Sequence, residues 1–487
     1  MNSEPSKQVV TRFAPSPTGF MHIGGIRTAL YAYLFAKKMN GTFILRIEDT
    51  DKAREIEGSI EHIKKSLNWL GITWDYGPDK PGPFGSTIQS ERLDSYKSYA
   101  EKLIKKGLAY PDPYTKEEVD AFRAAAEHEH RPFLFRDHRP EVFETWDGTK
   151  PLRLKVPQVK RYVWEDAVRG TLEAGEEMVD DIIIIKADGY PTYNFAHIID
   201  DLEMGVTHIM RGDEFIASMP KFLSIYDALE IPYPVFVTLP PILRDDRTKK
   251  LGKRDGAKDI LEYQTEGYLP ETMVNFLALI GWNPGTEQEI FTMKELIHTF
   301  SIDRIQRAGG AFNEEKLKWM NREHLQRLDN DTYFKMVKSA LPEAITQLPQ
   351  FSTERLERLV PVIKERVHSM GEMAEEARSG EYTFAFEAPL VPLEMVAWKK
   401  DASFKDALPR LVRAKELLRN ADFSSPESIK SALWAYAEEV GKGELLWPLR
   451  VTLSGRERSP DPFMCAFILG REETLDRITH VCDKIGE

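Results

Sequence analysis

The stretch FAPSPTGFMHIGG, residues 13–25, joins a strand-like run at residues 9–13 to a helical pattern at residues 26–40. Its two prolines and three glycines interrupt regular backbone structure, and a second strand-like run, TFILRIEDTD, follows the helical pattern. The order strand, helix, strand predicts a doubly wound parallel sheet, whose ligands bind at the carboxyl ends of the strands. The quoted stretch is the first of those ends.

The residues of this loop suit a nucleotide phosphate. A helix N-terminus offers unpaired N–H groups and a partial positive charge. Gly24 and Gly25 let a ligand approach the backbone, and His22 can donate a hydrogen bond to a phosphate oxygen. Neither G-x-G-x-x-G nor G-x-x-x-x-G-K-[ST] occurs here. A nucleotide site and a tight turn with a surface histidine are therefore two open alternatives.

A cationic cluster follows another strand-like run. The segment RDDRTKKLGKRDGAKD, residues 244–259, comes directly after YPVFVTLPPIL. Four cations surround Gly252, namely Lys249, Lys250, Lys253 and Arg254. Such a run is usually a solvated surface. At the end of a sheet strand, however, a flexible cationic loop is well placed to reach a polyphosphate.

The composition is that of a globular protein with several domains. The chain has 487 residues, 42% of them hydrophobic, and no apolar stretch approaches the length of a membrane span. The N-terminus lacks the pattern of a secretion signal, and Cys465 and Cys482 are not spaced like metal ligands. We therefore expect a cytoplasmic protein. The net charge of −12 argues against broad nonspecific nucleic-acid binding but allows a local basic face.

Together the two motifs resemble the signatures of class I aminoacyl-tRNA synthetases. PSPTGFMHIGG is similar to their histidine motif and KLGKR to their lysine motif. Four further stretches are similar to bacterial-type glutamyl-tRNA synthetases: TRFAPSPTG, LRIEDTD, GYPTYNFAHIIDDLEMGVTHIMRGDE and EKLKWMN. The resemblance runs from residue 9 to the C-terminus, and its motifs are long, ordered and co-occurring.

This resemblance implies a ligation in two steps. The carboxylate of L-glutamate attacks the α-phosphorus of ATP and releases pyrophosphate with Mg²⁺ assisting, and the terminal ribose of tRNA-Glu then accepts the glutamyl group. Because the nucleophile is already an anion, the reaction needs positioning and charge neutralisation rather than a protein base. The implied catalytic residues are His22 and Lys253. The implied ATP-binding residues are His22, Gly24, Gly25, Glu214, Lys250, Lys253 and Arg254.

Two positions depart from the general class I pattern. Gly25 stands where most class I enzymes have a second histidine, although glutamate-specific members share this glycine. Gly252 stands where serine is usual, which removes one hydroxyl donor and loosens the loop but leaves its charge.

The amino acid is selected by other residues. A glutamate side chain is a carboxylate, which a forked guanidinium holds best, and Arg12 and Arg211 each lie near a predicted strand end. Glu48 is an anion suited to the α-ammonium group. The glutamate pocket that the resemblance implies consists of Arg12, Ala14, Ser16, Glu48, Tyr193, His197 and Arg211.

Structural interpretations of these residues stay open. Arg12 could form an ion pair with Glu48 or Asp49. Tyr193 could belong to the core, and the helical segment around His197 could simply be packed.

Residues 87–189 interrupt the predicted sheet with strand signals of their own, KPLRLKVP and VDDIIIIKADG. In the family, such an insertion holds the acceptor end of the tRNA, and some relatives carry a zinc site built on paired cysteines at its start. The equivalent stretch AYPDPYTKEE offers Asp112 and Tyr114, and the insertion has no cysteine. We therefore expect no structural zinc and no other metal ligands in the protein.

The last third of the chain predicts helices. Strand signals nearly vanish after residue 329, and one helical stripe carries Leu356, Leu359, Ile363, Val367 and Met370. Related glutaminyl enzymes carry β-barrels for the anticodon, and a shortened paralogue lacks this region altogether. A helical tail therefore favours a glutamyl-tRNA synthetase, with a dimerisation module as the alternative. Its candidate RNA contacts, which could equally be surface charge, are Arg450, Arg456 and Arg458.

The predicted fold is therefore α/β, a Rossmann-type parallel-sheet catalytic domain with an inserted α+β acceptor-binding domain and an all-helical C-terminal anticodon-binding region. The predicted boundaries are 1–86 and 190–248 for the two catalytic halves, 87–189 for the insertion, 249–328 for a stem-contact helical domain with the KLGKR loop, and 329–487 for the anticodon-binding region.

Two functions compete with this prediction. A cytidylyltransferase uses a similar histidine loop and lysine motif, but it needs neither the arginine pair nor a helical tail. A tRNA-binding regulator with a decayed site would have lost His22 or Lys253, and both are present. The sequence leaves open whether tRNA-Gln is a second acceptor beside tRNA-Glu. On family grounds we expect a monomer.

Overall fold

The computed structural model describes residues 8–252 and 258–487. The chain forms two compact units, Met1–Gln264 with Pro270–Leu317 and Thr265–Leu269 with Lys318–Glu487. Within the described residues, no helix is long and apolar enough to cross a membrane.

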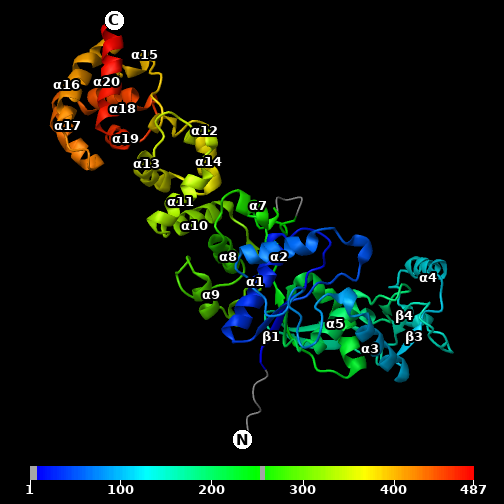
Figure 1. Ribbon diagram of the computed structural model, residues 1–487. Helices are drawn as coiled ribbons and strands as arrows, with labels where there is room; N and C mark the ends of the chain where they lie inside the picture. Colours follow the sequence, from blue (N-terminus) through cyan, green and yellow to red (C-terminus); the bar gives the residue numbers. More distant parts are fainter. Residues whose placement is uncertain (1–7, 253–257) are drawn as a thin grey trace. The chain divides into compact units, whose positions relative to one another are not determined.

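The first unit begins with the strand–helix–strand motif that the sequence predicts. Strand β1 (Val10–Phe13) leads into helix α1 (Ile23–Lys38), and strand β2 (Thr42–Leu45) pairs in parallel with β1 (Figure 1). The face of α1 that covers the strands is fully buried, including Ile26 and Leu30. Full burial of one such apolar side chain contributes about 1.5–3 kcal/mol to stability.

A four-stranded sheet continues this layer. Its strand order is β6–β5–β9–β8, with β8 and β9 parallel and β5 and β6 antiparallel. The backbone N–H of Thr207 donates to the carbonyl of Val10 at 2.9 Å, which brings β1 alongside β8. The strands are β5 (Tyr162–Asp166), β6 (Gly170–Ala174), β8 (His208–Gly212) and β9 (Val235–Leu239).

Helices accompany these strands. Besides α1, the described α-helices outside the insertion and before residue 300 are α2 (Ser59–Trp69), α5 (Tyr193–Glu203), α6 (Met219–Leu229), α7 (Ile260–Thr265), α8 (Pro270–Leu279) and α9 (Met293–Thr299). After β9, strand β10 (Ile242–Leu243) forms a short parallel pair with β11 (Gly310–Ala311).

Residues 87–189 contribute to two sheets. Their own antiparallel sheet has the order β3–β4–β7 and lies with α4 away from β1 (Figure 1). In contrast, β5 pairs with β9 of the catalytic layer through Asp166 and Phe236. Besides β5 and β6, the helices and strands of the insertion are α3 (Leu93–Lys105), β3 (Ala109–Pro111), α4 (Lys116–His128), β4 (Leu152–Leu154) and β7 (Ile183–Ile185).

From Glu314 to the C-terminus, all of which the structure describes, the chain forms helices and no strand (Figure 1). The predicted stripe of Leu356, Leu359 and Ile363 is fully buried in the core of the second unit. Pro361 lies inside a helix, where it removes one backbone hydrogen bond. The helices are α10 (Glu314–Gln326), α11 (Asn330–Ala340), α12 (Glu343–Thr346), α13 (Thr353–Arg366), α14 (Met370–Arg378), α15 (Leu393–Val396), α16 (Leu408–Arg419), α17 (Pro426–Val440), α18 (Lys442–Ser454), α19 (Pro462–Leu469) and α20 (Arg471–Gly486).

Candidate active site

A cavity of about 440 Å³ opens at the carboxyl ends of β1 and β8, beside the N-terminus of α1. This is the edge at which parallel sheets bind ligands. The structure brings most of the predicted site residues together there. Those that line the cavity are Arg12, Ala14, Ser16, His22, Gly24, Gly25, Glu48, Tyr193, Arg211, Glu214 and Lys250.

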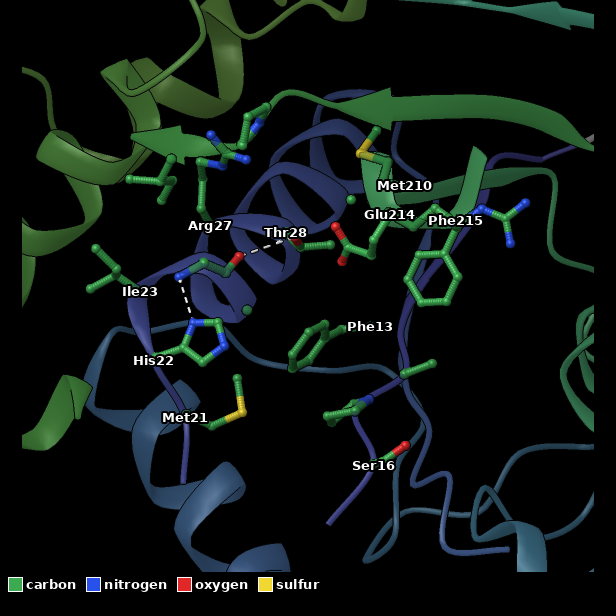
Figure 2. A pocket seen from close by; sticks show the side chains of 18 of the residues that line it. Phe13, Ser16, Met21, His22, Ile23, Arg27, Thr28, Met210, Glu214 and Phe215 are labelled. Carbon is green, nitrogen blue, oxygen red and sulfur yellow. Dashed lines mark hydrogen bonds between the residues drawn. The ribbon is translucent and has the colours of Figure 1, made fainter. Parts of the chain in front are cut away.

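His22 is the N-cap of α1. Its Nδ1 atom accepts a hydrogen bond from the backbone N–H of Gly24 at 3.1 Å (Figure 2). In the neutral ring the proton then lies on Nε2. Because this cap satisfies an N–H of the first turn, α1 begins at Ile23 and not at residue 26 as predicted. Gly24 and Gly25 therefore lie inside the helix rather than in the loop before it.

Both glycines make room for neighbouring side chains. A Cβ atom on Gly24 would lie 3.0 Å from Cε1 of the His22 ring. A Cβ atom on Gly25 would lie 2.8 Å from Cε of Met21, which is the flexible end of a side chain. Only the first of these contacts would displace the capping imidazole.

Glu214 and Lys250 form an ion pair at the opposite wall (Figure 2 shows Glu214). Nζ of Lys250 lies 3.0 Å from Oε2 of Glu214, and both side chains are more than half exposed. Burial would raise the pKa of Glu214, but a backbone hydrogen bond and Lys250 outweigh that effect and lower this pKa. An exposed pair contributes at most about 1 kcal/mol, so a bound phosphate can replace Glu214 as the partner of Lys250.

The described residues within and after the lysine motif KLGKR lie at the cavity. Leu251, inside the motif, lines the cavity wall. After the motif, Asp259 forms an antiparallel backbone bridge with His22. Lys253 and Arg254, both predicted to bind ATP, lie outside the described residues.

Arg12 is buried and ion-paired, but not with either predicted partner. Its Nε atom lies 3.1 Å from Oδ1 of Asp201, and Nη2 donates to Oδ2 at 3.4 Å. Glu48 pairs instead with Arg46, at 2.9 Å. The suggested pairing of Arg12 with Glu48 or Asp49 is therefore wrong, because Asp201 on α5 supplies the carboxylate. Burial raises the pKa of Glu48, against the charges of Arg46 and Arg12.

Arg211 is a buried cation that forms no ion pair with any carboxylate of the described chain. Its Nη1 atom has no hydrogen-bond partner there, and Nη2 lies 2.7 Å from the sulfur of Met219. The guanidinium stands 4.7 Å from the ring of Phe222 and 5.5 Å from that of Phe215. Burial lowers the pKa of Arg211. A desolvated, unpaired guanidinium is costly, and a carboxylate ligand would satisfy it.

Tyr193 lines the cavity, whereas His197 is buried behind it. The two rings stack with their centroids 4.8 Å apart, and Nδ1 of His197 lies 2.8 Å from the carbonyl oxygen of Tyr193. Burial lowers the pKa of His197 to about 3, so its ring is neutral at physiological pH. His197 thus supports Tyr193 and does not line the cavity as the glutamate-pocket prediction implies.

Arg27 on α1 is a buried residue of the cavity wall that was not predicted from the sequence (Figure 2). Its guanidinium donates to the carbonyl oxygens of Pro240 and Ile280, while Nε has no partner among the described residues. Its signal in the sequence is a single charge on the apolar face of a predicted helix. Other lining residues that were missed are mainly apolar and carry no such signal, including Phe13, Met21, Met210 and Phe215.

Comparison with known proteins identifies the family. Residues 8–319 match the catalytic-domain model of class I tRNA synthetases (E and Q), and residues 332–482 match an anticodon-binding domain. A glutamate–tRNA ligase of Clostridium botulinum is 40% identical over 97% of this chain and 98% of its own length. The chain belongs to the class I glutamyl-tRNA synthetases. A glutamate–tRNA ligase of Christiangramia forsetii is likewise 37% identical over 99% of this chain and all of its own.

Solved structures support the same family. A glutamate tRNA ligase from Elizabethkingia meningosepticum, in complex with its amino acid, has a TM-score of 0.88 and 34% identity. The alignment covers 98% of this chain and all of that one. A glutamate-tRNA synthetase from Elizabethkingia anophelis has a TM-score of 0.85. The predicted family, its ATP-dependent ligase activity and its fold of a class I catalytic domain followed by a helical anticodon-binding region are confirmed, and the cytidylyltransferase alternative is wrong.

Proposed function

We propose that this synthetase binds glutamate in the cavity with its side-chain carboxylate on Arg211. The buried guanidinium of Arg211, which no carboxylate of the described chain satisfies, is the observation that carries this proposal. Arg12 and Tyr193 complete the carboxylate side of the pocket, and Glu48 faces the α-ammonium group. Ala14 and Ser16 supply the loop backbone beside it.

ATP is proposed to occupy the part of the cavity next to the first turn of α1. His22, held by Gly24, would donate from Nε2 to the phosphates, and Lys250 would leave Glu214 for them. Lys253 is proposed as the second catalytic residue and Arg254 as a further phosphate ligand. Positive charge at these positions neutralises the pyrophosphate as it leaves.

Mg²⁺ is proposed as the cofactor. Within the described residues no cluster of three or more acidic, histidine or cysteine side chains could hold a metal ion, which fits a cation carried mainly by the substrate phosphates. Asp213 and Glu214 are the carboxylates of the cavity wall that could supply one further oxygen. The bound cation would add positive charge at the phosphates.

A structural zinc is not proposed. At the start of the insertion, Asp112 is paired with Arg153 at 2.7 Å, and the His138 ring stacks on Phe122 at 4.1 Å. The ion pair engages the carboxylate of Asp112, and the insertion offers no cysteine thiolate to a zinc ion. Metal analysis of the protein purified without chelators tests this proposal, and one zinc per chain would contradict it.

We propose that the tRNA contacts three segments of the chain. Residues 87–189 would hold the acceptor end, residues 249–328 the stem, and residues 329–487 the anticodon. In the helical unit, a hollow of about 440 Å³ is lined by Arg450 and Arg458, and also by Arg366, which pairs with Glu381 at 2.9 Å. Guanidinium groups bind phosphates and stack on unpaired bases, so we propose this hollow for an anticodon nucleotide.

Of the three arginines proposed from the sequence, Arg456 fits an RNA contact least well. Its Nη1 atom lies 2.6 Å from Oε2 of Glu381, within the same unit. Arg450 and Arg458 line the hollow.

The decisive experiment is ATP-dependent attachment of labelled glutamate and glutamine to transcripts of tRNA-Glu and tRNA-Gln. Glutamate on tRNA-Glu alone would establish a discriminating synthetase, and glutamate on both tRNAs a non-discriminating one. The variant Lys253→Ala should lose most of the rate. Absence of glutamate on either tRNA would overturn the proposal. Gel filtration of the same protein tests the proposed monomer.

A further inference from the structure

Two neighbouring carboxylates on α5 have different closest partners. Asp200 and Asp201 are 0% and 3% exposed, so both are fully removed from solvent. Asp201 lies 3.1 Å from Arg12 and 2.6 Å from Arg46. Asp200 lies 2.7 Å from Arg92, which belongs to the insertion, and its closest contact with Arg46 is 3.8 Å.

Asp201 is part of a row of alternating charges that begins and ends in the cavity. The row runs from Arg12 through Asp201 and Arg46 to Glu48, with closest N–O distances of 3.1, 2.6 and 2.9 Å. Its two ends line the cavity, whereas its two inner members do not. Burial would raise the pKa of Asp201, but the charges of Arg12 and Arg46 hold that pKa well below its usual range.

The geometry at Arg12 shows what Asp201 fixes. Both oxygens of the carboxylate accept from the Nε and Nη2 edge of the guanidinium, and this forked contact sets the plane of the group. The other contact of Arg12 is a long one, 3.5 Å from Nη1 to the carbonyl of Met210. Without Asp201, the buried guanidinium of Arg12 would have no carboxylate partner among the described residues, whereas Arg46 would keep Glu48.

From this arrangement we propose that Asp201 is a positioning residue for glutamate. It holds the guanidinium of Arg12 in place through the forked contact. This inference rests on the proposed function of the cavity.

The test compares Asp201→Asn with Asp200→Asn in the full-length enzyme. Asparagine has the same shape as aspartate but no charge, and both positions are equally buried. For Asp201→Asn we expect the KM for glutamate to rise about tenfold to a hundredfold, because misplaced binding groups cost that much. The KM for ATP should stay within about twofold. Asp200→Asn should leave both values within about twofold, although it breaks ion pairs as well.

A second pair of variants keeps the test decisive if Asp201→Asn does not fold. Arg12→Gln and the double variant Arg12→Gln/Asp201→Asn differ only at Asp201, and the double variant removes both charges instead of stranding one. If Asp201 acts through Arg12, the two should have glutamate KM values within about twofold of each other. If Asp201 has only a structural role, Asp201→Asn should raise the glutamate KM by the same factor in the wild type and in Arg12→Gln.

Two results would overturn the inference. One is a wild-type enzyme that charges glutamate while Asp201→Asn shifts the KM for glutamate no more than Asp200→Asn does. The other is a further tenfold rise in the double variant over Arg12→Gln. A wild type whose charging does not depend on glutamate would instead overturn the proposed function of the cavity, and with it the inference.

Discussion

His22 caps α1 by accepting the backbone N–H of Gly24 on Nδ1, and this bond leaves the imidazole proton on Nε2 at the far side of the ring. One side chain thus has a structural and a proposed catalytic role. Asparagine can serve the first but not the second. We expect His22→Asn to keep the stability of the wild type and to lose about 10²–10³-fold in kcat, as when one transition-state donor is removed.

His22→Ala is the matched control for that prediction. It should lose as much activity and, in addition, about 0.5–2 kcal/mol of stability, because the cap is gone. Thermal unfolding and single-turnover charging measure the two effects. If His22→Asn charges tRNA at the wild-type rate, the Nε2 proton has no part in the reaction.

Gly24 and Gly25 should respond differently to alanine. Both lie in the first turn of α1, where alanine favours the helix. A Cβ atom on Gly24 presses on the His22 ring at 3.0 Å, whereas one on Gly25 meets only the end of Met21. We therefore expect Gly24→Ala to lower kcat about tenfold or more and Gly25→Ala to lower it less than threefold. Steady-state charging kinetics measure both, and the reverse order would contradict the packing argument.

His197 makes the fold sensitive to acid. Its pKa is about 3 in the folded protein against 6.5 for the unperturbed side chain. Below pH 6.5 the unfolded chain therefore binds a proton that the folded chain does not, and stability falls as the pH falls. Between pH 6.5 and 4.5 the loss from this residue amounts to about 2 kcal/mol.

The variant His197→Asn cannot take up that proton. Urea unfolding followed by circular dichroism at pH 6.5 and 4.5 should show a smaller loss for the variant, by about 2 kcal/mol. Parallel pH profiles for the two proteins would mean that His197 is not held neutral by the fold.

Replacing either of two buried arginines by methionine should change the stability of the protein, in opposite directions for the two positions. Arg211 has no carboxylate partner in the described chain, whereas Arg46 contacts Asp201 at 2.6 Å and Glu48 at 2.9 Å. We expect Arg211→Met to stabilise the ligand-free protein by about 1 kcal/mol or more, and Arg46→Met to destabilise it by about 3–5 kcal/mol. Unfolding by urea without substrates measures both. Destabilisation by Arg211→Met would show that the guanidinium is satisfied in the free protein.

The local signals of the sequence predicted the layer that carries the site. The strand, loop and helix around FAPSPTGFMHIGG and the buried stripe of Leu356, Leu359 and Ile363 depend on spacing and turn residues, which are local. The predicted start of α1 was wrong because a histidine cap is not among the common capping residues.

Partners that are far apart along the chain could not be predicted in the same way. Arg12 meets Asp201 across 189 positions, and no local pattern indicates which of several nearby carboxylates it takes. The position of His197 behind Tyr193 likewise depends on how α5 packs against Phe222. Family resemblance named Arg12, Tyr193 and His197 but not Asp201, and only the packed structure shows which of these residues line the cavity and which lie behind it.

The proposed role of Arg211 in glutamate recognition can be tested most directly by the kcat/KM for glutamate in tRNA charging, measured for the wild type and for Arg211→Gln. A buried polar group that loses its charged partner typically costs about 10⁴-fold in discrimination, so we expect the variant's kcat/KM for glutamate to fall by about 10³-fold or more. Its KM for ATP should stay within about twofold of the wild-type value. A variant that charges glutamate with the wild-type kcat/KM would show that the substrate carboxylate does not bind at Arg211.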